Sequence, residues 1–297
     1  MAIPLCGMAV FFLWQWFNGG ITPEEAYEET RSALVAPRPA ATAPSSPRPA
    51  AEAAAAPQAP KAAKQAALPR VTRKSGSSEH RGDIVLIIDD LGFDGQPLER
   101  LMQLDPNVNV AILPNGTRAT EFANKLHARG FEVLCHLPMQ PRGKETPGAN
   151  AILTSMSDQE IADATRENIE AVPHARGVNN HMGSLATSDR RVMSSVIRAM
   201  PQGMYFIDSR TAGGSVASEV ARELNVRTAA RHIFLDDSAT ESAIRKQLQE
   251  LANAAEKRGV AIGIGHPYPV TMRVLADELP QLRARGFRLV RASEVVQ

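Results

Sequence analysis

Carboxylate, amide and imidazole side chains gather at the ends of apolar runs in the second part of the chain. In sequence order, the polar residues that end or directly follow such runs are Asp89, Asp90, Asn115, His136, Asn180, His181, Asp208, Asp236, Asp237 and His266. Imidazole nitrogens and carboxylate oxygens bind Zn²⁺ and similar divalent ions, and three protein ligands leave a position open for water. The pattern therefore predicts a hydrolytic metal site.

These side chains can meet only if the apolar runs are strands of one sheet. From residue 83 on, such runs alternate with segments of helical periodicity, which is typical of parallel strands joined by crossover helices. The predicted strands cover residues 83–89, 108–113, 131–137, 177–181, 204–208, 233–236, 260–265 and 287–290. Functional groups of β/α barrels and doubly wound sheets lie beyond the carboxyl ends of the strands. We therefore predict an α/β domain over residues 83–297 with the polar residues at one end.

Two helix starts are predicted from capping-box spacing. Ser157 is followed by Glu160, and Ser238 by Glu241, three residues later in each case. In a capping box the two side chains each satisfy a backbone amide of the first turn. We therefore expect helices to begin after Ser157 and after Ser238.

Residues 1–82 have a different composition and no candidate site. Residues 1–20 are an apolar anchor or signal-like segment, shorter than a confident membrane span. Residues 21–82 are rich in Ala and Pro and are predicted to be a disordered linker. We expect an uncleaved anchor in the inner membrane, which would place residues 83–297 in the periplasm or another extracytoplasmic space.

The charge balance argues against nucleic acid as a partner. The chain has a formal net charge of +1, and residues 1–82 contain 9 basic and 6 acidic residues, which leaves residues 83–297 at about −2. Cys6 and Cys135 are the only cysteines and are poorly placed to pair, so no disulfide is predicted.

Five segments of the foldable part resemble a known family. They are IIDD at 87–90, HLPM at 136–139, GVNNHMGS at 177–184, FIDSRT at 206–211 and GIGHP at 263–267. Their types and order are similar to the divergent branch of the polysaccharide deacetylases. The resemblance covers essentially all of residues 83–297, and NNHMGS and DSRT are its most specific parts.

The resemblance implies a distorted (β/α) barrel with mostly parallel strands, related to glycan and chitooligosaccharide N-deacetylases. It also implies a divalent metal, with zinc as the expected ion, bound by one Asp and two His. Matched by position, Asp90 would be the metal-binding Asp, Asp89 the general base and His266 the general acid. His136 and His181 would be the two imidazole ligands. The main family takes both imidazoles from one H-x-x-x-H stretch, whereas this chain takes them from two strands.

The chemistry of these residue types fits amide hydrolysis. A metal such as Zn²⁺ lowers the pKa of bound water to about 7 and polarises a carbonyl group. Asp89 would take a proton from the water, and His266 would protonate the departing amine, so that acetate and a free amino sugar separate. Either Asp208 or Asp237 is predicted to orient His266 through its other ring nitrogen. Arg210 could supply a cation where the main family has an Arg-x-Pro element, which is not evident in this sequence.

Three alternatives follow from the same residues. Carboxylates at the ends of strands would suit a glycosidase, but that interpretation leaves the three histidines at strand ends unexplained. The stretch Gly213-Gly214-Ser215 could hold the phosphate of a phosphohydrolase substrate, although such helix starts are usually ordinary caps. A catalytically silent glycan- or protein-binding barrel tethered in the cell envelope is the main alternative to the enzyme. The chain has no GxGxxG, Walker lysine loop or GxSxG motif that would indicate a nucleotide-binding protein or serine hydrolase.

Overall fold

The computed structural model describes residues 80–297, so the predicted anchor and residues 21–79 of the predicted linker lie outside the described residues. The strands are β1 (Gly82–Leu91), β2 (Asn109–Ile112), β3 (Glu132–Met139), β4 (Ala175–Met182), β5 (Tyr205–Asp208), β6 (Thr228–Ala230), β7 (Ile233–Phe234), β8 (Val260–Gly265) and β9 (Phe287–Leu289). The helices are α3 (Leu98–Leu101), α4 (Ala119–Ala128), α5 (Asp158–Glu170), α6 (Arg190–Ala199), α7 (Ala217–Glu223), α8 (Glu241–Arg258) and α9 (Pro269–Ala284), with short 3₁₀ turns η1 (Ala186–Ser188) and η2 (Ala292–Glu294).

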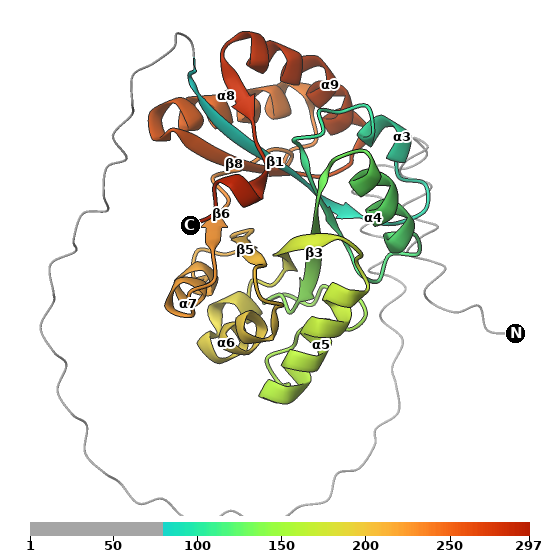
Figure 1. Ribbon diagram of the computed structural model, residues 1–297, viewed down its shortest axis with the longest axis vertical. Coiled ribbons are helices and arrows are strands. Elements are labelled where there is room, and N and C mark those ends of the chain that lie inside the picture. The colour runs from blue at the N-terminus through green and yellow to red at the C-terminus, as the bar shows by residue number, and fades with distance from the viewer. Residues whose placement is uncertain (1–79) are drawn as a thin grey trace, which may run out of the picture. The chain divides into compact units, whose positions relative to one another are not determined.

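All paired strands run parallel and form one curled sheet. Their order is β6-β5-β4-β3-β2-β1-β8-β7, and β9 pairs with the start of β1. Strand β1 pairs with β8 over residues 83–88. It also pairs with β9 over residues 82–84 and with β2 over residues 87–91. Figure 1 shows the strands curled around a common interior with the helices outside. The predicted α/β barrel of parallel strands is confirmed in the form of an open half-barrel.

The barrel is open between β6 and β7, where only the chain itself crosses the gap. Within residues 80–297 no ladder joins these two strands. The backbone N–H of Arg231 donates to the carbonyl of Asp208 beside β5, at 2.9 Å. The next residue, His232, donates instead to the carbonyl of Ile262 in β8, also at 2.9 Å. Two consecutive residues therefore bond to opposite sides of the opening, and both lie at the mouth of the barrel.

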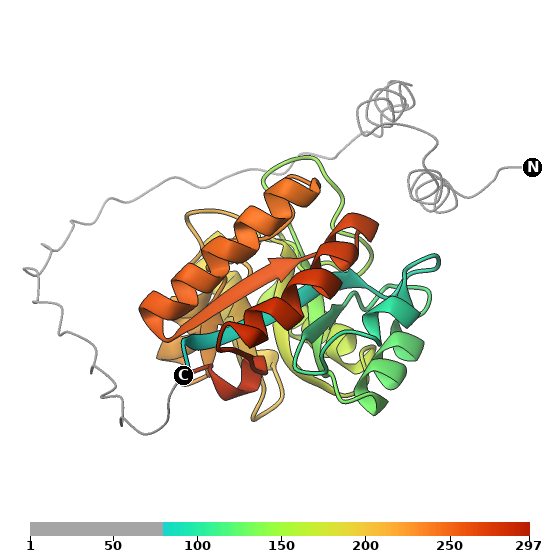
Figure 2. The ribbon, with the colours of Figure 1, turned by 90° about the horizontal axis from the view of Figure 1, so that it is seen from above.

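Two apolar layers hold the sheet in place. The larger layer fills the space between the sheet and the helices, and the smaller one fills the barrel interior. Figure 2 shows α8 and α9 lying over β8. A Cβ at Gly263 in β8 would lie 2.6 Å from the side chain of Leu251 in α8, so a larger residue there would force the Leu251 side chain to shift. The packed layers make a rigid support for residues at the strand ends.

The local predictions were mostly accurate, with two errors. Ser157 and Glu160 form the predicted capping box at the start of α5. The second predicted box is wrong, because Thr240, two residues after Ser238, caps α8 by accepting from the N–H of Ala243. The three-residue strand β6 was also missed, since residues 228–230 are too short to show periodicity. None of the helices in residues 80–297 is both long enough and apolar enough to cross a membrane.

Candidate metal and catalytic centre

The barrel interior changes from apolar to polar at the carboxyl ends of its strands. Successive strand residues point to opposite faces, so every second residue faces the interior. The interior series is Val85, Ile87 and Asp89 on β1, and Ile262, Ile264 and then His266 at the end of β8. On β3, Leu134 is followed in the same way by His136. The regular alternation of the strands therefore brings the predicted Asp89, His136 and His266 to one end of the barrel.

Asp90 reaches the same end by a different route. Alternation alone would turn it away from Asp89, and the sequence suggested that the strand must end there. Instead β1 continues to Leu91, with one extra residue relative to β2 between Ile88 and Leu91. Asp90 occupies this β-bulge with a φ of +59°, a left-handed conformation that Asp tolerates better than most residues. Gln96 holds the following turn by donating to the Asp90 carbonyl at 2.6 Å.

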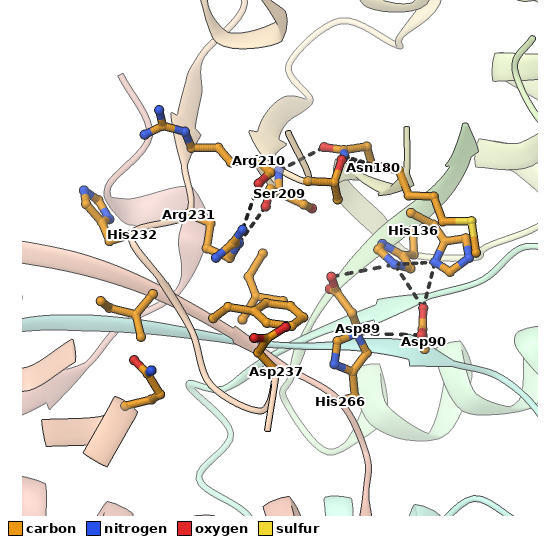
Figure 3. Close-up of a pocket in the computed structure, with 17 residues that line it drawn as sticks. Asp89, Asp90, His136, Asn180, Ser209, Arg210, Arg231, His232, Asp237 and His266 are labelled. Carbon is orange, nitrogen blue, oxygen red and sulfur yellow. Dashed lines mark hydrogen bonds and ion pairs between the residues drawn. The ribbon is translucent and has the colours of Figure 1, made fainter. Parts of the chain in front are cut away.

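Asp90, His136 and His181 converge on one point, as predicted. Oδ1 of Asp90 lies 2.9 Å from Nδ1 of His181 and 3.2 Å from Nε2 of His136, and these two ring nitrogens are 3.2 Å apart. Figure 3 shows the Asp90 carboxylate beside the ring of His136. The cluster thus has one donor atom from each of three different strands.

The cluster fits a divalent ion. Ligand atoms that each lie about 2.0 to 2.2 Å from one ion must be roughly 3 Å apart or slightly more, as they are here. Oδ1 of Asp90 is buried, yet it accepts no well-directed hydrogen bond from the described residues. A buried carboxylate oxygen of this kind requires an explanation, and a cation at the centre of the three atoms provides one. Burial opposes the charge of Asp90, but the close contacts and charges of His136 and His181 hold its pKa well below the usual range.

Asn179 connects His136 of the cluster to the predicted base, and the sequence prediction missed its role. Its Nδ2 donates to Oδ1 of Asp89 at 2.8 Å, which fixes the amide orientation because the carboxylate can only accept. Its Oδ1 therefore accepts from Nδ1 of His136 at 2.9 Å. In the neutral imidazole the proton is therefore held at Nδ1, and Nε2 has a lone pair directed toward the cluster. His136 pairs with Asn179 across β3 and β4, and this register could not be derived from the sequence.

Asp89 is fully enclosed beside the cluster. Its side chain lies at the interior end of β1, and its Oδ2 is 3.6 Å from Nε2 of His136. Burial raises the pKa of Asp89, while positive charge at His136 and His266 acts in the opposite direction. The neighbouring carboxylates Asp89 and Asp90 therefore have pKa values shifted in opposite directions, a pattern found where two acidic groups have different tasks.

His266 is oriented by Asp236, which corrects the prediction of Asp208 or Asp237. Nδ1 of His266 lies 2.9 Å from Oδ1 of Asp236, and Oδ2 of Asp236 accepts from the His266 N–H at 2.7 Å. Nε2 of His266 faces the cluster, 3.7 Å from Oδ2 of Asp90. Burial alone would lower the pKa of His266, but the hydrogen bond to Asp236 and the charge of Asp90 raise it to about 9.

The alternation of strand residues explains why Asp208 is not at this site. Tyr205 and Ile207 of β5 face the interior, so Asp208 faces outward. Its two carboxylate oxygens accept from the N–H of Arg210 and from the hydroxyl of Ser215, both at 2.8 Å. Asp208 therefore fixes the loop after β5 and does not orient His266. Asp237 does line the cleft, but its side chain makes neither a hydrogen bond nor an ion pair with His266.

A cleft of about 580 Å³ opens over the cluster. This volume is within the range of about 300 to 1,000 Å³ that is typical of small-molecule sites. Asp89, the three cluster residues and His266 line one part of it, and Arg210, Arg231 and His232 line another (Figure 3). Three residues of its wall, Asp90, Met182 and Arg210, have positive φ without being glycine, and such strained positions concentrate at functional sites.

Comparisons with solved structures agree with the fold. Crystal structures of an uncharacterized protein of Agrobacterium tumefaciens (TM-score 0.70, 20% identity, 75% of this chain and 92% of that one) and of a lactam utilization protein of Thermus thermophilus (0.50, 17%, 71% and 99%) share the fold.

Sequence relatives carry the comparison further. The uncharacterized protein YibQ of Escherichia coli is 38% identical over 216 residues, which are 72% of this chain and 67% of that protein. An uncharacterized protein of Haemophilus influenzae is 35% identical over 200 residues, which are 67% and 71% of the two chains. The family model for divergent polysaccharide deacetylases matches residues 86–296. The chain therefore belongs to the divergent polysaccharide deacetylase family.

Proposed function

We propose that this protein is a metal-dependent hydrolase that removes acetyl groups from N-acetylated sugars of a glycan or oligosaccharide. The observation that carries the proposal is the convergence of Asp90, His136 and His181, with a buried and unpaired carboxylate oxygen, in a cleft that also holds Asp89 and His266. Family membership supports the same chemistry. An envelope glycan and an extracytoplasmic location remain predictions from the sequence.

Zinc is the ion that we propose for the cluster. Two imidazole nitrogens and one carboxylate oxygen make a ligand set that zinc hydrolases use, and three protein ligands leave a coordination position open. The proton of His136 is already held at Nδ1 by Asn179, so its Nε2 is ready to bind an ion. When bound, such an ion would lower the pKa of water to about 7 and polarise the amide carbonyl group.

The remaining steps belong to side chains of this chain. Asp89 has one carboxylate oxygen held by Asn179, and we propose that its other oxygen takes a proton from the attacking water. A bond forms between the water oxygen and the carbonyl carbon, and the bond from that carbon to nitrogen breaks. His266, oriented by Asp236, gives a proton from Nε2 to the departing nitrogen, so that acetate and an amino sugar are released. Asp89 on β1 and His266, directly after β8, lie beside the cluster at separate positions, so one can take a proton while the other gives one.

The proposal is tested by acetate release and metal analysis on the same preparations. Wild-type protein supplied with Zn²⁺ should bind about one equivalent and release acetate from N-acetylated oligosaccharides. Asp89→Asn should keep the metal and lose turnover by about 10² or more, the usual scale for a positioned base. Glu132→Gln is the matched control, since Glu132 is also a buried carboxylate but lies at the first position of β3, outside the cleft, and its turnover should stay near the wild-type rate.

The same experiment tests the alternative of a catalytically silent binding barrel. Wild-type protein that binds metal and releases no acetate from any N-acetylated substrate would replace the enzyme with a binding module. Protein that binds no divalent metal at all would contradict the metal site itself.

A further inference from the structure

Arg231 lies in the wall of the cleft and is fixed by the backbone. Its Nε donates to the carbonyl of Ser209 at 2.6 Å, and its Nη2 donates to the carbonyl of Arg210 at 2.8 Å. The guanidinium carbon also lies 4.8 Å from the centre of the Phe234 ring. Figure 3 shows the guanidinium pointing at the two carbonyls that it contacts. These contacts hold one edge and one face of the guanidinium group.

The opposite edge of this guanidinium has no partner in the part of the chain that the structure describes. Nη1 makes no hydrogen bond to residues 80–297, and no carboxylate lies within 4 Å of the group. Arginine has five N–H donors, so two bonds at one edge leave the donors of the other edge free. Such a pair matches the two oxygens of a carboxylate or phosphate.

The charge of Arg231 is also poorly compensated. Burial lowers its pKa, and the nearby charge of Arg210 lowers it further, against opposing effects of Asp89, Asp208 and Asp237. Arg118, which has the carboxylate of Glu121 at contact distance, has a raised pKa instead. A half-buried cation without an ion-pair partner is costly unless a ligand supplies the negative charge.

Arg210 adds a second positive charge at the same part of the cleft. Its side chain is exposed and forms neither a hydrogen bond nor an ion pair with residues 80–297. Its backbone has a φ of +48° and is held by Asp208 and by Arg231. The loop after β5 thus keeps Arg210 beside Arg231 in spite of the repulsion between two cations. Asp237 is the only acidic cleft residue away from the metal cluster, and it contacts neither arginine within 4 Å.

We propose that Arg231 and Arg210 form a subsite for a negatively charged substituent, a carboxylate or a phosphate, on the saccharide whose amide faces the Asp90–His136–His181 cluster. This inference rests on the proposed function for the position of the amide. Both sites open into one cleft, so an acidic group on the same sugar or on a neighbouring one would be bound while the amide is presented. The substrate class is therefore an acidic N-acetylated glycan, not a neutral one.

The test is binding of matched oligosaccharides to the full-length, zinc-loaded protein by calorimetry. Asp89→Asn serves as the background so that the ligand is not consumed. The probes are a neutral tetramer of N-acetylglucosamine, a tetrasaccharide of alternating N-acetylglucosamine and glucuronic acid, and an N-acetylated tetrasaccharide with one phosphate monoester. At least one acidic probe should bind about tenfold or more tightly than the neutral one, as expected for a charge-assisted bidentate contact. Which acidic probe is preferred identifies the carboxylate or the phosphate as the group recognised.

Variants of the two arginines locate the subsite. Arg231→Gln should abolish the preference for the acidic probe, and Arg210→Gln should reduce it without risk to the fold, since that side chain makes no bond. Arg227→Gln is the matched control, because Arg227 likewise donates to two carbonyls, those of Ser293 and Gly203, but lies outside the cleft. It should retain the full preference.

Two different failures are distinguishable. Equal binding of neutral and acidic probes, or an undiminished preference in Arg231→Gln, would overturn the subsite while acetate release from the neutral tetramer still supported the deacetylase. A preference that depends on Arg231, in a protein that releases no acetate from any probe, would support the subsite and contradict the proposed activity.

Discussion

Strand β3 carries two buried ionisable residues on its interior face, Glu132 and His136, and the two have opposite surroundings. Glu132, at the first position, accepts from the hydroxyl of Tyr205 at 2.7 Å and from the N–H of Ser293 at 2.8 Å, and Ser293 Oγ donates to its second oxygen. His136, four residues later on the same interior face, has one nitrogen paired with Asn179. Its other nitrogen is directed at a carboxylate oxygen that has no donor.

The difference separates a structural polar network from a functional one. At the amino end of the barrel the carboxylate is satisfied by donors of the chain, which ties the C-terminal segment to the barrel floor. At the carboxyl end Oδ1 of Asp90 and the two ring nitrogens face one another, an arrangement that positive charge, of a bound ion or of a protonated imidazole, stabilises. Both ends hold buried charged groups, so burial and charge do not distinguish them. The difference is that the Glu132 carboxylate has donors, whereas Oδ1 of Asp90 has none.

The largest expected effect comes from removing one carboxylate at each end of the barrel, Asp90 at the carboxyl end and Glu132 at the amino end. Asp90→Ala should lose stoichiometric zinc and all measurable turnover, because one of three ligands is removed, and should cost little stability in metal-free protein. Glu132→Ala should do the reverse. It leaves the partners at Tyr205 and Ser293 unpaired, which should lower the free energy of unfolding by about 2 to 4 kcal/mol, while zinc binding is retained. Metal analysis and urea unfolding on both variants give the four values.

A different pattern would break the comparison. If Asp90→Ala kept its zinc, the cluster would not be the metal site. If Glu132→Ala lost zinc at a temperature where it is folded, the amino-end network would be more than structural.

Residue types and strand periodicity were sufficient to predict much of the site. His136 and His181 were predicted as ligands from the family resemblance, and their places late in β3 and β4 agree with it, because parallel strands present their carboxyl ends together. Asp208 lies one residue out of step with Tyr205 and Ile207, but Phe206 makes the run apolar on both faces, so only the structure shows which face is interior.

Other features depend on geometry that the sequence does not encode locally. The bulge at Asp90 shows only as a register shift against β2, and the bond from Asn179 to Asp89 spans 90 residues. Asp236 follows Phe234 at the same interior parity, yet β7 is only two residues long, so no periodicity could place it. Strand β6 and the crossing at Arg231 were missed for the same reason.

An intermediate effect is expected from Asn179, which we place as a positioning residue. Asn179→Ala removes the acceptor that holds the His136 proton at Nδ1, so zinc affinity should fall by about 10- to 100-fold, the usual scale for partners of metal-binding histidines. Nitrogen NMR shifts of His136 should show that the Nδ1–H tautomer is no longer dominant in metal-free protein.

Asn109→Ala is the control from the amino end. Asn109 also makes two buried hydrogen bonds, to the carbonyl of Leu86 and from the N–H of Ala292. It should lose stability without losing zinc affinity. Equal zinc affinity in wild-type protein and Asn179→Ala would show that His136 needs no such partner.

The smallest effect on stability concerns Tyr205, and its pH dependence distinguishes it from other small losses. Tyr205 is fully buried, and its ring lies so close to Gly177 that a Cβ there would be 2.4 Å away, so Phe is the replacement that keeps the packing. At neutral pH Tyr205→Phe should lower the free energy of unfolding by about 1 kcal/mol, the usual net value of one hydrogen bond.

Burial and the charge of Glu132 raise the pKa of Tyr205 well above its usual value of 10.0. In the unfolded chain the phenol therefore ionises first as the pH rises past about 10, which favours unfolding of the wild type and has no counterpart in the Phe variant. The stability difference between the two proteins should thus be constant below pH 9 and shrink above pH 10, in paired urea titrations where all other ionisations cancel. A difference that stays constant up to pH 11 would mean that Glu132 and Tyr205 are not coupled as the structure places them.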